Sequence, residues 1–130
     1  MKTILKKIKT LIPILFLTVF VSSIYSCKKE GVGGKSTIQG VVKHHSQIIP
    51  NATVYIKYGA TDFPGPNPAD YDSQVAADGS GNYQFTGLVK GDYYLYGYGY
   101  DISILEDVKG GVAVNVKKNK TAEKDIPVTE

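Results

Sequence analysis

Short runs rich in valine, isoleucine and tyrosine recur roughly every ten residues along this chain, separated by glycine, proline, asparagine or aspartate. The runs lie at 37–43, 52–58, 73–77, 83–86, 92–100, 111–117 and 122–128. This spacing is typical of strands joined by turns, and the stretch lacks the apolar period of a helix. The pattern therefore predicts an all-β domain over residues 36–130, a sandwich or small barrel of seven strands.

Alternation within the runs predicts which face of each strand is buried. Successive side chains of a strand point to opposite faces, so apolar residues two positions apart share one face. The intervening residues are mostly polar and should face water. The predicted core between the two sheets comprises Ile38, Val42, Val54, Ile56, Tyr83, Phe85, Tyr93, Leu95, Val112, Val114, Val116, Ile126 and Val128.

Four motifs in this stretch carry a family resemblance. They are IQGVV at 38–42, IPNATV at 49–54, DGSGNYQF at 78–85 and GLVKGDYYL at 87–95. In this order they resemble the carboxypeptidase regulatory-like, or transthyretin-like, superfamily, whose topology the Cna B-type adhesin repeats share. The resemblance covers nearly all of residues 37–128 and implies a seven-stranded Greek-key sandwich. The turn at 78–81 is rich in residues that tolerate positive φ, and Leu88 is expected to close one end of the core.

The first 26 residues form a separate segment with the composition of an export signal. Four lysines precede an uncharged apolar run at 11–21, which is followed by a pair of serines. This order is that of a signal peptide. The apolar run is too short for a membrane-spanning helix, which needs about 20 residues.

Cys27 is the single cysteine and lies directly after this leader. The preceding Ile24-Tyr25-Ser26 resembles the lipobox of bacterial lipoproteins, although Tyr25 is bulkier than usual there. The resemblance implies cleavage before Cys27, a diacylglyceryl group on its sulfur and acylation of the new amino terminus. Such double acylation anchors a protein stably. The alternative is a soluble secreted protein with an unpaired thiol.

Residues 27–35 are charged and glycine-rich, which predicts a flexible tether between the anchor and the domain. Lys28, immediately after the cysteine, resembles the residue found in lipoproteins sorted to the outer membrane. Lys28-Lys29-Glu30 also resembles tags that send lipoproteins to the cell surface. We therefore expect an outer-membrane location, on either the periplasmic or the cell-surface side.

Charge excludes one class of partner. The whole chain has a net charge of +3, but four of its fifteen basic residues lie in the leader, which leaves eleven lysines against twelve acids, about −1. No basic stripe interleaved with aromatic residues occurs after the leader. Nucleic-acid binding is therefore not expected.

Two surface features are candidate binding elements. In the run at 93–100, Tyr94, Tyr96, Tyr98 and Tyr100 should line the outward face of one strand, where tyrosine rings suit stacking on sugars or anchoring a protein. The alternative is cross-strand packing that stiffens the sheet. The proline-rich segment at 59–72 is longer than a hairpin needs and carries Phe63 and Tyr71, so it is the second candidate.

Metal and catalytic sites have weaker support. Asp62, Asp70 and Asp72 are a weak calcium candidate because their spacing matches no known loop. His44 and His45 lie together after the first predicted strand, where solvated side chains are expected, and no further histidine is available for zinc. No cofactor is expected.

Related families with chemistry lack their key residues here. In the Cna B-type repeats a glutamate assists isopeptide formation, but Gly97 follows Tyr96 where that residue would stand, so Lys43 and Asp125 are not expected to join. The hydroxyisourate hydrolases need arginine, which this chain lacks. We expect no enzyme activity. Residues 101–109 remain open between an edge strand, a helical turn and a cap over the core.

These observations predict a non-catalytic, lipid-anchored binding or scaffolding module of the cell envelope, with a glycan or an envelope protein as partner. The alternative is a purely structural spacer or an assembly subunit of an envelope complex. Because the superfamily hosts transport, adhesion and accessory roles, its fold alone does not choose between them.

Overall fold

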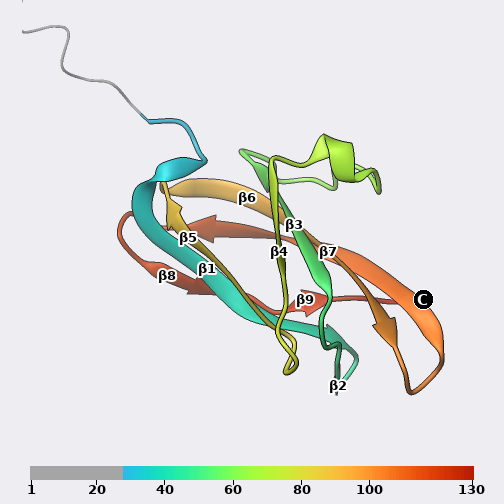
Figure 1. Ribbon diagram of the computed structural model, residues 1–130. Helices are drawn as coiled ribbons and strands as arrows, with labels where there is room; N and C mark the ends of the chain where they lie inside the picture. The colour runs from blue at the N-terminus through green and yellow to red at the C-terminus, as the bar shows by residue number, and fades with distance from the viewer. Residues whose placement is uncertain (1–27) are drawn as a thin grey trace, which may run out of the picture.

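The computed structural model describes residues 28–130, and the predicted leader and Cys27 lie outside the described residues. The regular secondary structure of this part of the chain is almost entirely strand and forms two facing sheets (Figure 1). Among residues 28–130, no helix has the length and apolar character needed to cross a bilayer. The elements are β1 (Val32–His44), β2 (Gln47–Ile48), β3 (Thr53–Tyr58), η2 (Pro68–Asp70), β4 (Ser73–Ala76), β5 (Asn82–Leu88), β6 (Gly91–Asp101), β7 (Glu106–Val116), β8 (Thr121–Glu123) and β9 (Ile126–Pro127).

The first sheet is organised around β1. This strand pairs antiparallel with β2 and β5, and parallel with β8 and β9. The β1–β2 connection is a tight turn, with His44 opposite Gln47 and with His45 at φ 53°. Because β8 and β9 run parallel to β1, the end of the chain lies beside its first strand, as Figure 1 shows.

The second sheet has the strand order β4-β3-β6-β7. Its longest pairing joins β6 and β7 in an unbroken antiparallel register from Gly91 opposite Val116 to Asp101 opposite Glu106. On its other side β6 pairs with β3, which places Tyr55 beside Tyr96. Pairing with β3 on one side and β7 on the other makes β6 a central strand, and its outer face carries the tyrosine run.

The core lies between the two sheets and confirms the prediction from alternation. Twelve of the thirteen predicted core residues are buried, and Val112 is half-buried and packed against them. Leu88 is 2% exposed, in agreement with its expected place at one end of the core. Burying an aliphatic side chain of this size contributes about 1.5–3 kcal/mol, so this core is the main stabilising feature. It also contains Ile49, Ala52, Ala77 and Val108.

The strand boundaries differ from the prediction in two places. Of the three alternatives for residues 101–109, the edge strand holds in part, because β7 begins at Glu106 and lies at the edge of the second sheet. Residues 102–105 form the turn from β6 to β7, and the exposed Ile102, Ile104 and Leu105 do not cap the core. The predicted strand at 122–128 is divided into β8 and β9. At the break, Asp125 Oδ1 accepts a hydrogen bond from Val41 N at 3.0 Å, so a side chain replaces a ladder partner.

Within the predicted tether at 27–35, the structure differs from the prediction from Gly31 onward. Gly31 is buried, and β1 already begins at Val32, which pairs with Leu88 of β5. Glycine at this point allows close approach, since a Cβ at Gly34 would lie 2.1 Å from the Leu88 carbonyl oxygen. Glycine at position 34 therefore reflects close backbone packing rather than a flexible spacer.

Candidate functional site: an aromatic face on the second sheet

The four candidate tyrosines of β6 project from the outer face of the second sheet. Tyr93 and Leu95, which alternate with them, are fully buried in the core. Tyr96 is paired in register with Tyr55 of β3 on one side and with Gly111 of β7 on the other. A Cβ at Gly111 would lie 2.6 Å from a ring carbon of Tyr94, so the absence of a side chain there leaves room for that ring.

The proline-rich segment at 59–72 folds over two of these tyrosines, Tyr94 and Tyr96. The Phe63 ring centroid lies 6.0 Å from that of Tyr94 and 5.4 Å from that of Tyr96. Tyr71 stacks on Tyr96 at 5.7 Å with an interplanar angle of 17°, and it also contacts Tyr55 at 5.6 Å. The two candidate elements of the sequence therefore form one surface. We call it the aromatic face: Tyr55, Phe63, Tyr71, Tyr94, Tyr96, Tyr98 and Tyr100.

Hydrogen bonds hold the covering segment to β3. The Tyr71 hydroxyl donates to the Gly65 carbonyl at 2.8 Å, which closes the segment on itself. Asp72 Oδ2 accepts from Tyr58 N at 2.7 Å, and its other oxygen lies 3.5 Å from Lys57 Nζ. Such fixed backbone contacts preorganise the rings, so a ligand would not have to order them.

The aromatic face has a covered base and an exposed rim. Tyr96 lies on the outer face as expected, but it is only 5% exposed because Phe63 and Tyr71 cover it. Phe63, Tyr98 and Tyr100 are 50%, 42% and 49% exposed. Tyr96 therefore supports the surface, while the rings of the three rim residues are exposed to solvent.

Four hydroxyls of the aromatic face, those of Tyr71, Tyr94, Tyr96 and Tyr98, remain protonated at neutral pH. Burial raises the pKa of Tyr71 to about 12 and also raises the pKa of Tyr94 and of Tyr96. A hydrogen bond with Asp107 raises the pKa of Tyr98. The face thus offers neutral rings with polar tips, which suit a ligand that has both apolar C–H faces and hydroxyl groups.

The aspartates suggested for calcium do not come together. Asp72 is engaged by Tyr58 and Lys57, and Asp70 lies in the short η2 helix. Within residues 28–130 there is no group of three or more histidine, cysteine, aspartate or glutamate side chains placed to hold a metal ion. The set Asp62, Asp70 and Asp72 is therefore not a preformed site in this structure.

The structure contains a buried polar cluster that the sequence interpretation missed. His44 Nδ1 lies 2.7 Å from Asp101 Oδ2, and Ser103 donates to Asp101 Oδ1 through both its hydroxyl and its backbone N–H. His44 Nε2 lies 2.9 Å from Glu130 Oε2, close enough for an ion pair but not oriented as a hydrogen bond. His44 is therefore not the solvated turn residue we expected.

A signal for this cluster was present in the alternation. His44 is in phase with Ile38 and Val42 on β1, and Asp101 is in phase with Tyr93 and Leu95 on β6, so both belong to core-facing positions. Ser103 bonds to the aspartate and not to the histidine, so the arrangement lacks an activated nucleophile. It joins the ends of β1 and β6 to the chain terminus.

Lys43 and Asp125, the pair weighed for an isopeptide bond, are neighbours in the structure. Lys43 Nζ lies 2.8 Å from Asp125 Oδ2 and both side chains are partly exposed, so water screens the pair. The ion pair lowers the pKa of Asp125. An ionised, solvated pair of this kind is not set up for amide formation.

The fold and the aromatic face together define the class: an all-β, two-sheet sandwich with an aromatic surface on one outer sheet face. The chain matches no family model and no curated protein. A candidate carbohydrate-binding protein from Pseudomonas aeruginosa has a similar structure, with a TM-score of 0.52 and 15% identity over 75% of this chain and 90% of that one. At this identity the similarity shows the fold alone.

Two further structures are more distant. A DUF3823 family protein from Parabacteroides merdae has a TM-score of 0.43 and 15% identity, over 75% of this chain and 47% of that one. The minor pilin GBS52 from Streptococcus agalactiae has a TM-score of 0.41 and 18% identity, over 77% of this chain and 44% of that one. This chain therefore spans less than half the length of either protein.

Proposed function

We propose that this protein is a non-catalytic, lipid-anchored binding module of the cell envelope and that its aromatic face binds a glycan. The observation that carries the proposal is the exposed rim of Phe63, Tyr98 and Tyr100 beside a stacked and hydrogen-bonded base. Aromatic rings with polar tips match the C–H faces and hydroxyl groups of sugars. The fold shared with a candidate carbohydrate-binding protein is consistent with this reading.

Anchoring and location are further parts of the proposal. The leader followed by Cys27 supports cleavage and acylation at that residue, and Lys28 supports sorting to the outer membrane. The four motifs between residues 38 and 95 support membership of the carboxypeptidase regulatory-like superfamily. The mass of the intact mature protein tests the first point, because acylation at Cys27 adds the mass of its acyl chains.

A glycan array probed with the mature protein tests the binding function. We expect binding to one class of glycan and its loss when Phe63→Ala and Tyr98→Ala are combined. Ile102→Ala is the matched control, since Ile102 is 72% exposed but lies in the β6–β7 turn outside the aromatic face. Tyr98→Phe should retain most of the binding if the ring, rather than the hydroxyl, supplies the contact.

A structural spacer or an assembly subunit is the second candidate, favoured by the mutual packing of Phe63, Tyr71 and Tyr96. In that case the rings stiffen the sheet and bind nothing. Absence of binding to any glycan by a folded mature protein would favour this candidate. Equal binding by the doubly substituted protein would move the glycan site away from the aromatic face.

A further inference from the structure

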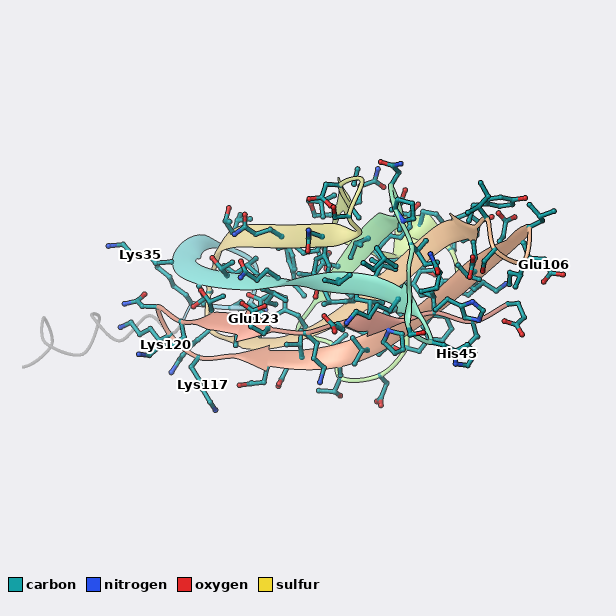
Figure 2. All side chains as sticks on the ribbon, turned by 90° about the horizontal axis from the view of Figure 1, so that it is seen from below. Lys35, His45, Glu106, Lys117, Lys120 and Glu123 are labelled. Carbon is teal, nitrogen blue, oxygen red and sulfur yellow. The ribbon has the colours of Figure 1, made fainter. Side chains whose placement is uncertain are left out.

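Positive charge is concentrated at one end of the sandwich. Figure 2 shows Lys35, Lys117 and Lys120 at this end, whereas His45 and Glu106 lie at the opposite end. It is also the end at which the described chain begins. Seven of the eleven lysines in residues 28–130 belong to it, and all seven are exposed: Lys28, Lys29, Lys35, Lys90, Lys117, Lys118 and Lys120. We call this set the lysine end.

Three segments distant in the sequence bring these lysines together. They are residues 28–35, the β5–β6 turn with Lys90, and the β7–β8 turn at 117–120. The strand registers force the convergence, since Val32 pairs with Leu88, Gly91 with Val116, and Thr37 with Thr121. The lysine end is thus a property of the sheets and not of one charged stretch.

Hydrogen bonds, two of them buried, fix the three segments to one another. The Tyr93 hydroxyl accepts from Gly31 N at 2.8 Å and donates to the Val89 carbonyl at 2.6 Å, and Tyr93 is fully buried. Ser36, 1% exposed, donates to the Lys117 carbonyl at 2.7 Å. Thr37 N donates to the Lys120 carbonyl at 3.0 Å. The backbone that carries the like-charged side chains is therefore held in place despite their repulsion.

A hollow of about 540 Å³ lies at this end, and four lysines but no carboxylate line it: Lys28, Lys35, Lys90 and Lys118. A neighbouring hollow of about 610 Å³ shares Lys28 and Lys90 and includes a single acid, Glu30. Within the described part of the chain, the lysines in ion pairs are Lys43 and Lys57, neither of which belongs to the lysine end. Ammonium groups without acidic partners around a hollow match a phosphate group.

We propose that the lysine end docks on an anionic lipid surface and that its hollow receives phosphate-bearing headgroups. The proposal rests on the proposed anchoring, because acyl chains on Cys27 would hold Lys28 and its neighbours within about one Debye length of the membrane, roughly 8 Å at physiological ionic strength. A basic patch then supplies the second, electrostatic signal that orients the domain. The β6–β7 turn would point away from the membrane, leaving the aromatic face open at the side.

Residue-resolved amine labelling tests the proposal on the mature protein made from the full chain. The protein is placed in nanodiscs of phosphatidylcholine, either alone or mixed with phosphatidylglycerol, and modification of each lysine is measured by mass spectrometry. In the anionic discs we expect labelling of Lys35, Lys90 and Lys118 to slow by about threefold or more, with Lys57 and Lys109 unchanged. Salt at 1 M should abolish the difference.

Charge reversal provides the matched comparison. Lys90→Glu combined with Lys118→Glu should remove the protection of Lys35, whereas Lys109→Glu with Lys124→Glu makes the same charge change elsewhere and should leave it intact. Equal labelling in the two kinds of disc, or protection that survives Lys90→Glu with Lys118→Glu, would overturn the proposal. Protection by inorganic phosphate in neutral discs, without protection by anionic lipid, would also overturn it in favour of a small-anion site.

Failure of docking and failure of the proposed function give different results. The variant with Lys90→Glu and Lys118→Glu should bind the same glycans as the unchanged protein, since neither lysine belongs to the aromatic face. If the intact mass shows no acyl chains, the protein is instead sedimented with vesicles of the same two lipid compositions. Preferential sedimentation with the anionic vesicles would then support docking, and equal sedimentation would contradict it.

Discussion

His44 Nδ1 lies 2.7 Å from Asp101 Oδ2 although 57 positions separate the two residues, and both side chains are buried. The contact joins the end of β1 in one sheet to the end of β6 in the other. Glu130 faces Nε2 of the same ring, and the His45 ring lies 4.6 Å away. Ser103 supplies the remaining hydrogen bonds to Asp101. One titratable cluster thus links both sheets and the chain terminus.

Because of this cluster, we expect the folded protein to be most stable within a limited range of pH. Hydrogen bonding to Asp101 raises the pKa of His44 above 6.5, and hydrogen bonds from Ser103 and His44 lower the pKa of Asp101 below 3.8. The histidine contribution is complete below pH 6.5 and is lost as pH rises through the folded-state pKa. The aspartate contribution is present above pH 3.8 and is lost as pH falls through its lowered pKa. The melting temperature should be highest between these limits.

Thermal melts across the pH range, followed by circular dichroism, check this prediction. In the His44→Gln variant the decline above pH 6.5 should be much smaller, because the group that loses its proton is absent. His45→Gln is the control, since that ring is exposed and should leave the decline in place. A decline of the same size in the His44→Gln variant would assign the pH dependence to other groups.

The base of the aromatic face should matter for folding and its rim for binding. Tyr96→Ala removes a 5% exposed ring beneath Phe63 and Tyr71, and should lower the free energy of unfolding by about 3–5 kcal/mol. Tyr100→Ala removes a ring that is 49% exposed and should change the free energy of unfolding by less than about 0.5 kcal/mol. Urea denaturation measures both values. Similar losses in the two variants would contradict the division into base and rim.

The buried hydroxyl of Tyr93 should be needed for stability beyond its ring. Tyr93→Phe leaves Gly31 N and the Val89 carbonyl oxygen without this partner, at an expected cost of about 1–3 kcal/mol. Tyr98→Phe removes the hydroxyl of a residue that is 42% exposed and serves as the control. Hydrogen exchange should also become faster at Gly31 in the Tyr93→Phe variant. Unchanged exchange there would show that the hydroxyl does not hold this segment.

Gly40 should not tolerate a side chain. A Cβ at this position would lie 1.9 Å from the Lys124 carbonyl oxygen, a backbone atom between β8 and β9. Gly40→Ala should therefore force these strands away from β1 and destabilise the fold by about 3 kcal/mol. Gly79→Ala is the control, because no atom lies within 4 Å of its added Cβ. Comparable unfolding midpoints in urea for the two variants would refute this prediction.

Several parts of the fold could be predicted from the local sequence pattern. Alternation placed Val54, Ile56, Tyr93 and Leu95 inside and identified the face of β6 that carries the tyrosines. The same reasoning applied strictly would have placed His44 inside. A histidine pair beside a turn is usually solvated, and the sequence prediction for His44 followed that rule instead. The tertiary partner Asp101 makes the burial of His44 favourable.

The covering of Tyr96 could not be predicted from the local sequence pattern. Alternation indicates only which face of the sheet a residue occupies, and residues 59–72 decide whether that face is open. The length and proline content of this segment predict an unusual loop but not where it lies. Its position depends on contacts such as that between Asp72 and Tyr58 N, which form only when the segment returns to β3.

The amino-acid sequence by itself determined the all-β class, most of the strands and most of the core, because a period of two residues is a local property that the pleated backbone converts directly into an inside and an outside. Tertiary structure alone decided that Phe63 and Tyr71 cover Tyr96, that His44 meets Asp101, and that lysines from three segments gather at one end. These are contacts between residues far apart in the chain. Strand register and close backbone approach set them, and no local pattern encodes either.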